Sequence, residues 1–233
     1  MTHFNFSKHS KNSTAIDILM NFLMASIALF FNGFGLYLTM KAGIGAAPWD
    51  VFNLGISKTF GVLYGTASIT VAFIILIIDV CLKEPIGLAM IIDSIVVGKA
   101  VDFFNYVDFV PETDNLILSI LTLFGGLVVM GYTQLFYMKA SLGCGPRDTL
   151  LVGISKRIKK IPIGVVAIGI LSAATLAGFL LGGPVGLGTI LCAVCQGPIM
   201  QFAFKTFSFD ATTVKHQNIA ESVKVFVRRT AQT

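Results

Sequence analysis

The sequence predicts an all-α polytopic membrane protein with six transmembrane helices in two three-helix repeats of inverted topology. Three observations predict this fold: an apolar composition, an internal duplication and an uneven distribution of positive charge. The 233 residues are 55% apolar and 12% charged, and their mean hydropathy is +0.83. Soluble domains carry about 25% charged residues, so the composition excludes an ordinary soluble domain.

The apolar residues form runs long enough to cross a bilayer. Four stretches contain no Asp, Glu, Lys or Arg: Ile18–Met40, Thr59–Ile78, Asn115–Met138 and Ile161–Phe204. A membrane-spanning helix needs about 20 apolar residues, so the first three stretches predict one span each and the last predicts two. Another span is predicted over Pro85–Tyr106, with Pro85 in its first turn.

The sequence contains two copies of one unit. The stretch Met40–Lys58, MKAGIGAAPWDVFNLGISK, returns 98 residues later as Met138–Lys156, MKASLGCGPRDTLLVGISK, and ten of the nineteen positions are identical. A second pair, Glu84–Phe104 and Gly183–Ala203, aligns at nearly the same offset. Such self-similarity indicates a duplication. The predicted units are a cytoplasmic N-terminal tail (1–15), a first membrane repeat (16–107), an acidic linker (108–114), a second membrane repeat (115–207) and a cytoplasmic C-terminal tail (208–233).

Positive charge predicts the orientation of the chain. With both termini in the cytoplasm, fourteen of the seventeen Lys and Arg residues are cytoplasmic, Lys41 and Lys58 lie outside, and Lys99 lies within a span. This distribution follows the positive-inside rule and explains the net charge of +5 without a nucleic-acid partner. Each repeat holds an odd number of spans, so its two copies must enter the membrane from opposite sides, as in many secondary transporters.

The repeated motif predicts a short helix after a sharp turn. Gly45 and Gly143 permit the turn, and Pro48 and Pro146 suit the first helical position. About eleven residues span about 16 Å, too little to cross about 30 Å of hydrocarbon, so each helix is either interfacial or re-entrant. The helix ends in a repeated Gly-Ile-Ser-Lys block, whose glycines and serines are Gly55, Ser57, Gly153 and Ser155.

Asp50 and Asp148 fall at the third helical position and admit two interpretations. In the first, they are helix caps and the motif serves packing. In the second, both helix N-termini point to the middle of the membrane and build a polar site, where the N-termini suit anions and the aspartates suit a cation or proton. Trp49 and Arg147 share one motif position and fit either surface anchoring or contacts at that site.

Ionisable residues inside the third span are further candidates, because burying charge in a membrane is costly. Asp93, eight residues beyond Pro85, is expected near the middle of the membrane as a proton or ion site. Its alternative is a protonated carboxyl bonded to a neighbouring helix. Lys99 and Asp102 share one helical face and are predicted to form a structural ion pair.

No pattern in the sequence points to an enzyme or a cofactor. The four cysteines lie in or beside apolar segments, the three histidines lie in the tails, and no metal-ligand spacing is present. The expected partners are bilayer lipid and a small-molecule or ion substrate, and the sequence is compatible with a homo-oligomer.

The motifs resemble those of a known family. G-x-x-P-W-D-x-x-x-x-G-I-S at Gly45–Ser57, G-P-R-D at Gly145–Asp148 and GGPVGLGT at Gly182–Thr189 are similar to the YczE/YyaS/YitT group of bacterial integral membrane proteins, most closely its YczE branch. The resemblance covers all six predicted spans and implies a location in the bacterial cytoplasmic membrane, but no substrate. The corresponding first-half turn, EPIGLAMI, lacks the Gly-Thr pair.

Two functions fit these features. The first is a secondary transporter or channel-like permease for a small solute, with its path lined by Asp50, Asp93, Arg147 and Asp148. The second is a non-transporting membrane scaffold or accessory subunit of another membrane complex, in which the aspartates only cap helices.

Overall fold

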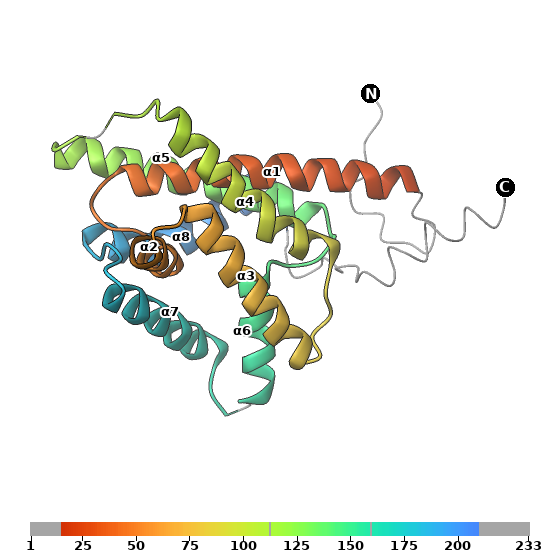
Figure 1. The fold of residues 1–233 in the computed structure, drawn as a ribbon. Helices are drawn as coiled ribbons and strands as arrows, with labels where there is room; N and C mark the ends of the chain where they lie inside the picture. The colour runs from red at the N-terminus through yellow and green to blue at the C-terminus, as the bar shows by residue number, and fades with distance from the viewer. Residues whose placement is uncertain (1–14, 112, 159, 210–233) are drawn as a thin grey trace, which may run out of the picture.

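The computed structural model describes residues 15–111, 113–158 and 160–209. All regular secondary structure in these residues is helical (Figure 1): α1 (Ala15–Lys41), α2 (Pro48–Phe60), α3 (Tyr64–Cys81), α4 (Leu88–Val107), α5 (Leu116–Lys139), α6 (Pro146–Arg157), α7 (Ile163–Leu180) and α8 (Leu187–Thr206). The predicted N-terminal tail and nearly all of the C-terminal tail lie outside the described residues.

The long helices coincide with the predicted apolar runs. Five of the described helices are long and apolar enough to cross a membrane, namely α1 from Leu19, α3, α5, α7 and α8. Helix α4 has 20 residues, but its three charged side chains break the apolar run. The short helices α2 and α6 have 13 and 12 residues and begin at Pro48 and Pro146, as predicted.

The start of α4 differs from the prediction. Pro85 does not open this helix, because Glu84–Gly87 is non-helical and α4 begins at Leu88. The amide of Ala89 instead donates to the carbonyl of Leu142, at 3.0 Å. Asp93 consequently lies about 8 Å along the helix, in its second turn.

The outer surfaces of the long helices are apolar. Large side chains such as Ile168, Leu180, Ile190 and Val194 are more than half exposed in the isolated chain. Exposed apolar surface on this scale marks a contact with lipid or another protein. Together with the apolar helices, it identifies a multi-pass membrane protein.

Helices α1 and α5 pack against each other along much of their length and run antiparallel, side by side (Figure 1). Ala25 near the start of α1 packs in one cluster with Tyr137 near the end of α5, and Asn32 Nδ2 donates to Thr133 Oγ1 at 3.0 Å. Further along α1, a Cβ on Gly35 would lie 2.8 Å from the carbonyl oxygen of Gly126. Small residues permit this close approach.

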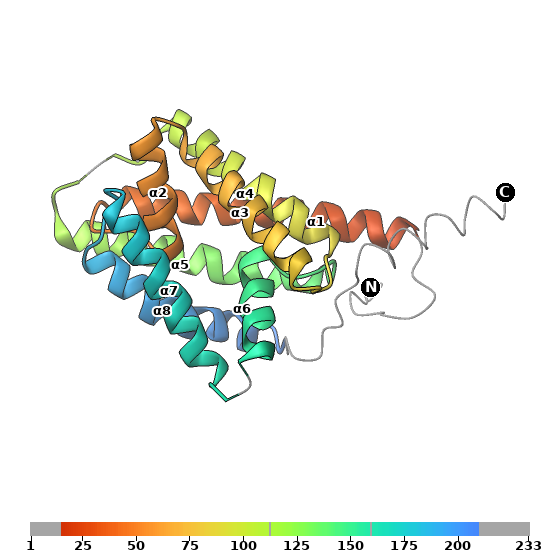
Figure 2. The same ribbon diagram turned by 60° about the horizontal axis from the view of Figure 1, so that its bottom comes forward.

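The two halves of the chain make matching contacts. Helix α4 packs on α1 as α8 packs on α5, and α2 packs on α7 as α6 packs on α3 (Figure 2). The hydrogen bond from Ala89 to Leu142 has a counterpart in the one from Gly188 to Ile44, at 2.7 Å. The duplication is therefore present in the packing as well as in the sequence.

One pair of contacts breaks this match. Helices α3 and α4 pack closely, whereas α7 and α8 make no comparable contact. A Cβ on Gly98 in α4 would lie 3.0 Å from the carbonyl oxygen of Gly65 in α3, but the equivalent glycines, Gly164 and Gly197, have no such neighbour within 4 Å. At this crossing, the two helices of the first half are in contact, and the two equivalent helices of the second half are separated. We call the α3–α4 pair closed and the α7–α8 pair open.

Candidate functional site

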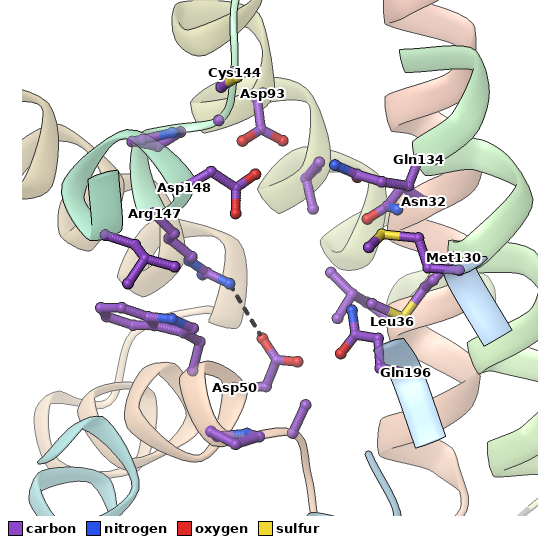
Figure 3. Close-up of a pocket in the computed structure, with 18 of the residues that line it drawn as sticks. Asn32, Leu36, Asp50, Asp93, Met130, Gln134, Cys144, Arg147, Asp148 and Gln196 are labelled. Carbon is purple, nitrogen blue, oxygen red and sulfur yellow. Dashed lines mark ion pairs between the residues drawn. The ribbon is translucent and has the colours of Figure 1, made fainter. Parts of the chain in front are cut away.

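A cavity of about 630 Å³ lies between the two halves. It is lined by all eight helices of the described chain, including the N-terminal turns of α2 and α6. Its charged lining residues are Asp50, Asp93, Arg147 and Asp148 (Figure 3). The folded chain thus gathers at one cavity the four residues that the sequence suggested for a solute path.

Two glycine turns direct the short helices into this cavity. Gly45 and Gly143 have φ angles of +109° and +125°, a region that favours glycine. A Cβ on Gly45 would lie 2.6 Å from the amide nitrogen of Gly186, and one on Gly143 would lie 2.8 Å from Cα of Gly87. Each turn therefore needs glycine for its conformation and for its close packing on the other half.

Asp50 is held in a buried hydrogen-bond chain. Asp50 is 2% exposed, and its carboxylate accepts a hydrogen bond from the hydroxyl of Tyr64 at 2.7 Å. That hydroxyl accepts one from Asn53 at 3.4 Å. The N-cap residues Ala47 and Gly145 make no side-chain cap hydrogen bond. Within the described chain, no helix amide donates to Asp50, which accepts from Tyr64 instead, and none donates to Asp148.

Arg147 of the second motif reaches the first motif. Its Nη1 lies 4.0 Å from Asp50 Oδ1 (Figure 3), and its guanidinium carbon lies 5.2 Å from the ring centre of Trp49. This distance is within the range of a cation–π interaction. Trp49 and Arg147 occupy the same position in their motifs, so equivalent residues of the two copies meet at the cavity.

Asp93 and Asp148 lie together on another side of the cavity (Figure 3). The Oδ2 atoms of these residues would lie 2.8 Å and 3.8 Å from a Cβ placed on Gly145. Asp148 is exposed to the cavity and Asp93 is partly buried. Within the described chain, neither carboxylate has a hydrogen-bond or ion-pair partner.

Several neutral polar residues also line the cavity, and the sequence analysis did not select them as site residues. They are Asn32, Gln134, Tyr137 and Gln196. Their signal in the sequence is a polar side chain inside an apolar span, which usually faces the protein interior. Cys144 and Cys192 line the cavity as well, but no group of three or more His, Cys, Asp or Glu residues in the described chain is arranged to hold a metal ion.

The predicted ion pair between Lys99 and Asp102 is not formed. Asp102 Oδ1 accepts a hydrogen bond from the amide of Gly65 at 2.7 Å, whereas the side chain of Lys99 is exposed. The amides in the first turn of a helix lack partners within the helix, so Asp102 satisfies one of them at the start of α3. Helix spacing placed the two charges near each other, but tertiary structure supplied Asp102 with another donor.

The C-terminal parts of α2 and α6 pack against neighbouring helices and turns. Gly55 packs against α7, where a Cβ would lie 2.6 Å from the carbonyl oxygen of Gly178, and Ser57 Oγ donates to the carbonyl of Val62 at 2.6 Å. Gly153 packs beside Glu84, where a Cβ would lie 3.1 Å from its Cγ. The hydroxyl of Ser155 is buried and has no partner in the described chain.

Glu84, in the turn between α3 and α4, forms ion pairs with the C-terminal end of α6. Lys156 Nζ lies 2.6 Å from Glu84 Oε2, and Arg157 Nη1 lies 3.5 Å from Oε1. Arg157 also donates to the carbonyl of Leu82. The hydrogen bond from Lys156 holds the pKa of Glu84 below its ordinary value. At the equivalent place in the other half, Thr59 donates to the carbonyl of Leu181 at 2.9 Å.

Comparisons with known proteins identify relatives of this chain. It is 29% identical to the uncharacterized membrane protein YczE of Bacillus subtilis over 189 residues, which cover 80% of this chain and 86% of YczE. It is 33% identical to an uncharacterized protein of Haemophilus influenzae over 175 residues (75% and 79% of the two chains). It is 28% identical to the uncharacterized protein YyaS of B. subtilis over 188 residues (79% and 92%).

No solved structure matches the chain. A family model described as a family of unknown function, DUF6198, matches residues 19–205. The match extends from α1 to α8 and includes both motifs and the cavity. The chain belongs to the DUF6198 family, with YczE and YyaS among its relatives.

Proposed function

We propose that this protein is a non-enzymatic secondary transporter or channel-like permease for a small solute. The observation that carries the proposal is the difference between two equivalent helix pairs around the cavity. The α3–α4 pair is closed at Gly65 and Gly98, and the α7–α8 pair is open at Gly164 and Gly197. In alternating access, two copies of one unit exchange conformations during the transport cycle. The two copies here have different conformations, and each shows the conformation that the other adopts in the cycle.

An inverted repeat of six spans is part of this proposal. Two features support it: the antiparallel contact of α1 with α5 and the position of the motif turns. Ile44, after α1, contacts the start of α8, and Leu142, after α5, contacts the start of α4. If α3 and α7 cross the membrane, these contacts place the two motif turns on opposite sides. Helix α4 is then the sixth span, and its charged residue Asp93 faces the cavity rather than lipid.

The proposed transport cycle exchanges the states of the two helix pairs. In the orientation that positive charge predicts, Gly164 lies at the cytoplasmic end of α7, so the structure is open towards the cytoplasm. Closing Gly164 on Gly197 while Gly65 separates from Gly98 would open the cavity to the outside. The short helices α2 and α6 would remain at the centre as re-entrant elements, with non-helical backbone lining the cavity as membranes require.

Accessibility of the cavity from each side tests alternating access without knowledge of the solute. A single cysteine replaces Gln134 in a protein lacking Cys81, Cys144, Cys192 and Cys195, and a membrane-impermeant thiol reagent is applied to oriented vesicles from either side. We expect labelling from both sides, because the cavity opens alternately. A scaffold with a fixed cavity would be labelled from one side or from neither.

A cross-link that locks the α7–α8 pair sharpens this test. Gly164 and Gly197 have open space around them, so cysteines are placed there and joined by a short bifunctional thiol reagent before Gln134→Cys is probed. We expect labelling from outside only. Unchanged labelling from the cytoplasmic side in the cross-linked form would contradict alternating access. Size-exclusion chromatography shows whether the double variant is folded.

The solute and the role of the aspartates are tested together. A thermal-shift screen on detergent-purified protein finds solutes that bind the folded state, and flux of each is then measured in proteoliposomes. Asp148→Asn should leave protein abundance near normal but reduce ligand stabilisation and flux, because Asp148 faces the cavity. The scaffold alternative predicts reduced abundance and no flux with the unmodified protein.

A further inference from the structure

We infer that Asp93, Asp148 and Tyr137 form a binding site for the ammonium group of a small organic amine. We call these three residues the ammonium site. The inference rests on the proposed function, since it names the chemical class of the solute for the same cavity. It follows from which charged groups of the cavity are already paired and which are not.

The two carboxylates of the ammonium site are open to a ligand. Asp50, the third carboxylate of the cavity, is bound by Tyr64 and lies 4.0 Å from Arg147. Asp93 and Asp148 have no such partner in the described chain, although their Oδ2 atoms lie within 4 Å of one point beside Gly145. Two unpaired carboxylates near each other in a membrane protein are costly, and a bound cation would offset that cost.

Tyr137 supplies an independent sign of a missing ligand. Its side chain lines the cavity, is 3% exposed, and carries a buried hydroxyl with no hydrogen-bond partner in the described chain. Buried hydroxyl groups are normally hydrogen-bonded. Tyr137 packs in one cluster with Ala89, and Asp93 follows Ala89 by one helical turn. Tyr137, Asp93 and Asp148 all line the same cavity.

The charge of the cavity selects a cation over an anion. Three carboxylates face one guanidinium group among the lining residues. Helix N-termini attract anions. However, α2 and α6 each carry an aspartate in the first turn, whose negative charge already offsets the positive potential of the helix N-terminus. Arg147, the cation nearest to an incoming anion, is engaged with Asp50 and Trp49.

The number of unpaired acceptors and the size of the cavity favour an organic ammonium group over a bare metal ion. A primary ammonium has three N–H donors, one for each of the side chains of Asp93, Asp148 and Tyr137. The cavity of about 630 Å³ falls within the range of small-molecule sites, about 300 to 1,000 Å³. Apolar walls for the carbon skeleton are provided by Leu151, Ile170 and Leu171.

The inference is tested by binding to the intact, detergent-purified protein. The probe is propylammonium chloride, compared at equal ionic strength with tetramethylammonium chloride, sodium chloride and sodium propionate. We expect propylammonium alone to raise the melting temperature in a saturable way, because a ligand of the folded state stabilises it. Equal stabilisation by tetramethylammonium or by sodium would overturn the inference, since neither ion can donate hydrogen bonds.

Variants assign the binding to the ammonium site. Asp93→Asn and Asp148→Asn should each weaken propylammonium binding by about tenfold or more, because each removes a charge-assisted hydrogen bond. Tyr137→Phe should weaken it by a smaller factor. Asp114→Asn, which removes an exposed carboxylate of the linker, is the matched control and should not alter the affinity. Affinity unchanged in both Asp93→Asn and Asp148→Asn overturns the inference, and so does its loss in Asp114→Asn.

The two proposals fail in different ways. If propylammonium binds through Asp93 and Asp148 but no amine enters proteoliposomes that carry the protein, the ammonium site is supported and the transport proposal is contradicted. If no amine binds but the cavity is accessible from both sides in alternation, the transport proposal is supported and the ammonium site is contradicted. Circular dichroism of each variant shows whether a loss of binding reflects unfolding.

Discussion

Asp50 and Asp148 occupy the same motif position but have different surroundings in the folded chain. Asp50 is buried and paired, whereas Asp148 faces the cavity unpaired. Two differences between the copies accompany this contrast. Arg147 stands where the first copy has Trp49 and reaches Asp50 and Trp49, and Ile163 stands where the first half has Tyr64, the donor to Asp50. The motif alone predicted two equal aspartates, since spacing along the chain does not show which aspartate Arg147 approaches.

The hydrogen bond from Tyr64 to Asp50 makes a testable contribution to stability. Tyr64→Phe removes the hydroxyl and leaves a buried carboxylate without its nearest donor, so we expect a loss of about 1 to 3 kcal/mol in the free energy of unfolding. Tyr106→Phe is the matched control, because Tyr106 is 90% exposed. Reversible unfolding in detergent measures both variants. Equal stability of the two would show that the bond contributes nothing.

The glycines of the motif turns give a second prediction. Gly45→Ala and Gly143→Ala place a Cβ in the left-handed region and against the backbone of the other half. We expect each to destabilise the protein by about 2 kcal/mol or more, or to prevent folding. Gly169→Ala in α7, which has open space around it, is the control and should be close to neutral or stabilising. Melting temperatures that match the control would contradict the role assigned to these turns.

At the scale of helices, the sequence predicts the elements well and their contacts poorly. Long apolar runs and the Gly–Pro turns predicted most helix limits to within a few residues. The start of α4 was missed because Gly87 lies against the Leu142 carbonyl and the amide of Ala89 donates to it, a contact between residues far apart in the chain. The interaction of Asp102 with Gly65 was missed for the same reason.

The junction between α6 and the α3–α4 turn should make stability depend on pH. The hydrogen bond from Lys156 lowers the pKa of Glu84 in the folded chain, so its contribution is present above the ordinary value of about 4.3. It is lost as the pH falls below that value and through the lowered pKa. Asp108 titrates in the same range, because a hydrogen bond from Lys41 lowers its pKa as well.

Two variants separate these contributions. Glu84→Gln should lower the melting temperature at pH 7 by about 3 °C and reduce its decrease between pH 5 and pH 3. Thr59→Ala, at the equivalent junction of the other half, should leave that pH dependence intact, because no charge is removed. An unchanged pH profile in Glu84→Gln would show that the junction contributes no stability through this carboxylate.

At the scale of the whole molecule, the duplication is visible in the sequence, and its spatial consequence is visible in the fold. Counting spans predicted an odd repeat, and the antiparallel contact of α1 and α5 is what an inverted pair would produce. The different states of the α3–α4 and α7–α8 pairs were not predicted, because the glycines at these crossings are the same in both halves. The halves do differ at Asp102, whose counterpart is Gln201, and Asp102 accepts a hydrogen bond from the Gly65 amide across the closed pair. Spacing along the chain does not show that Asp102 makes this contact.

The inverted arrangement is the central claim, and two-sided labelling tests it most directly. Phe60 and Ile158 hold equivalent positions at the ends of α2 and α6, and they are 70% and 41% exposed. Each is replaced by cysteine in a protein lacking its four native cysteines and treated with a membrane-impermeant thiol reagent on intact cells and on inverted vesicles. We expect position 60 to react only from outside and position 158 only from the cytoplasm. Reaction of both from the same side would contradict the inverted repeat and remove the main support for transport.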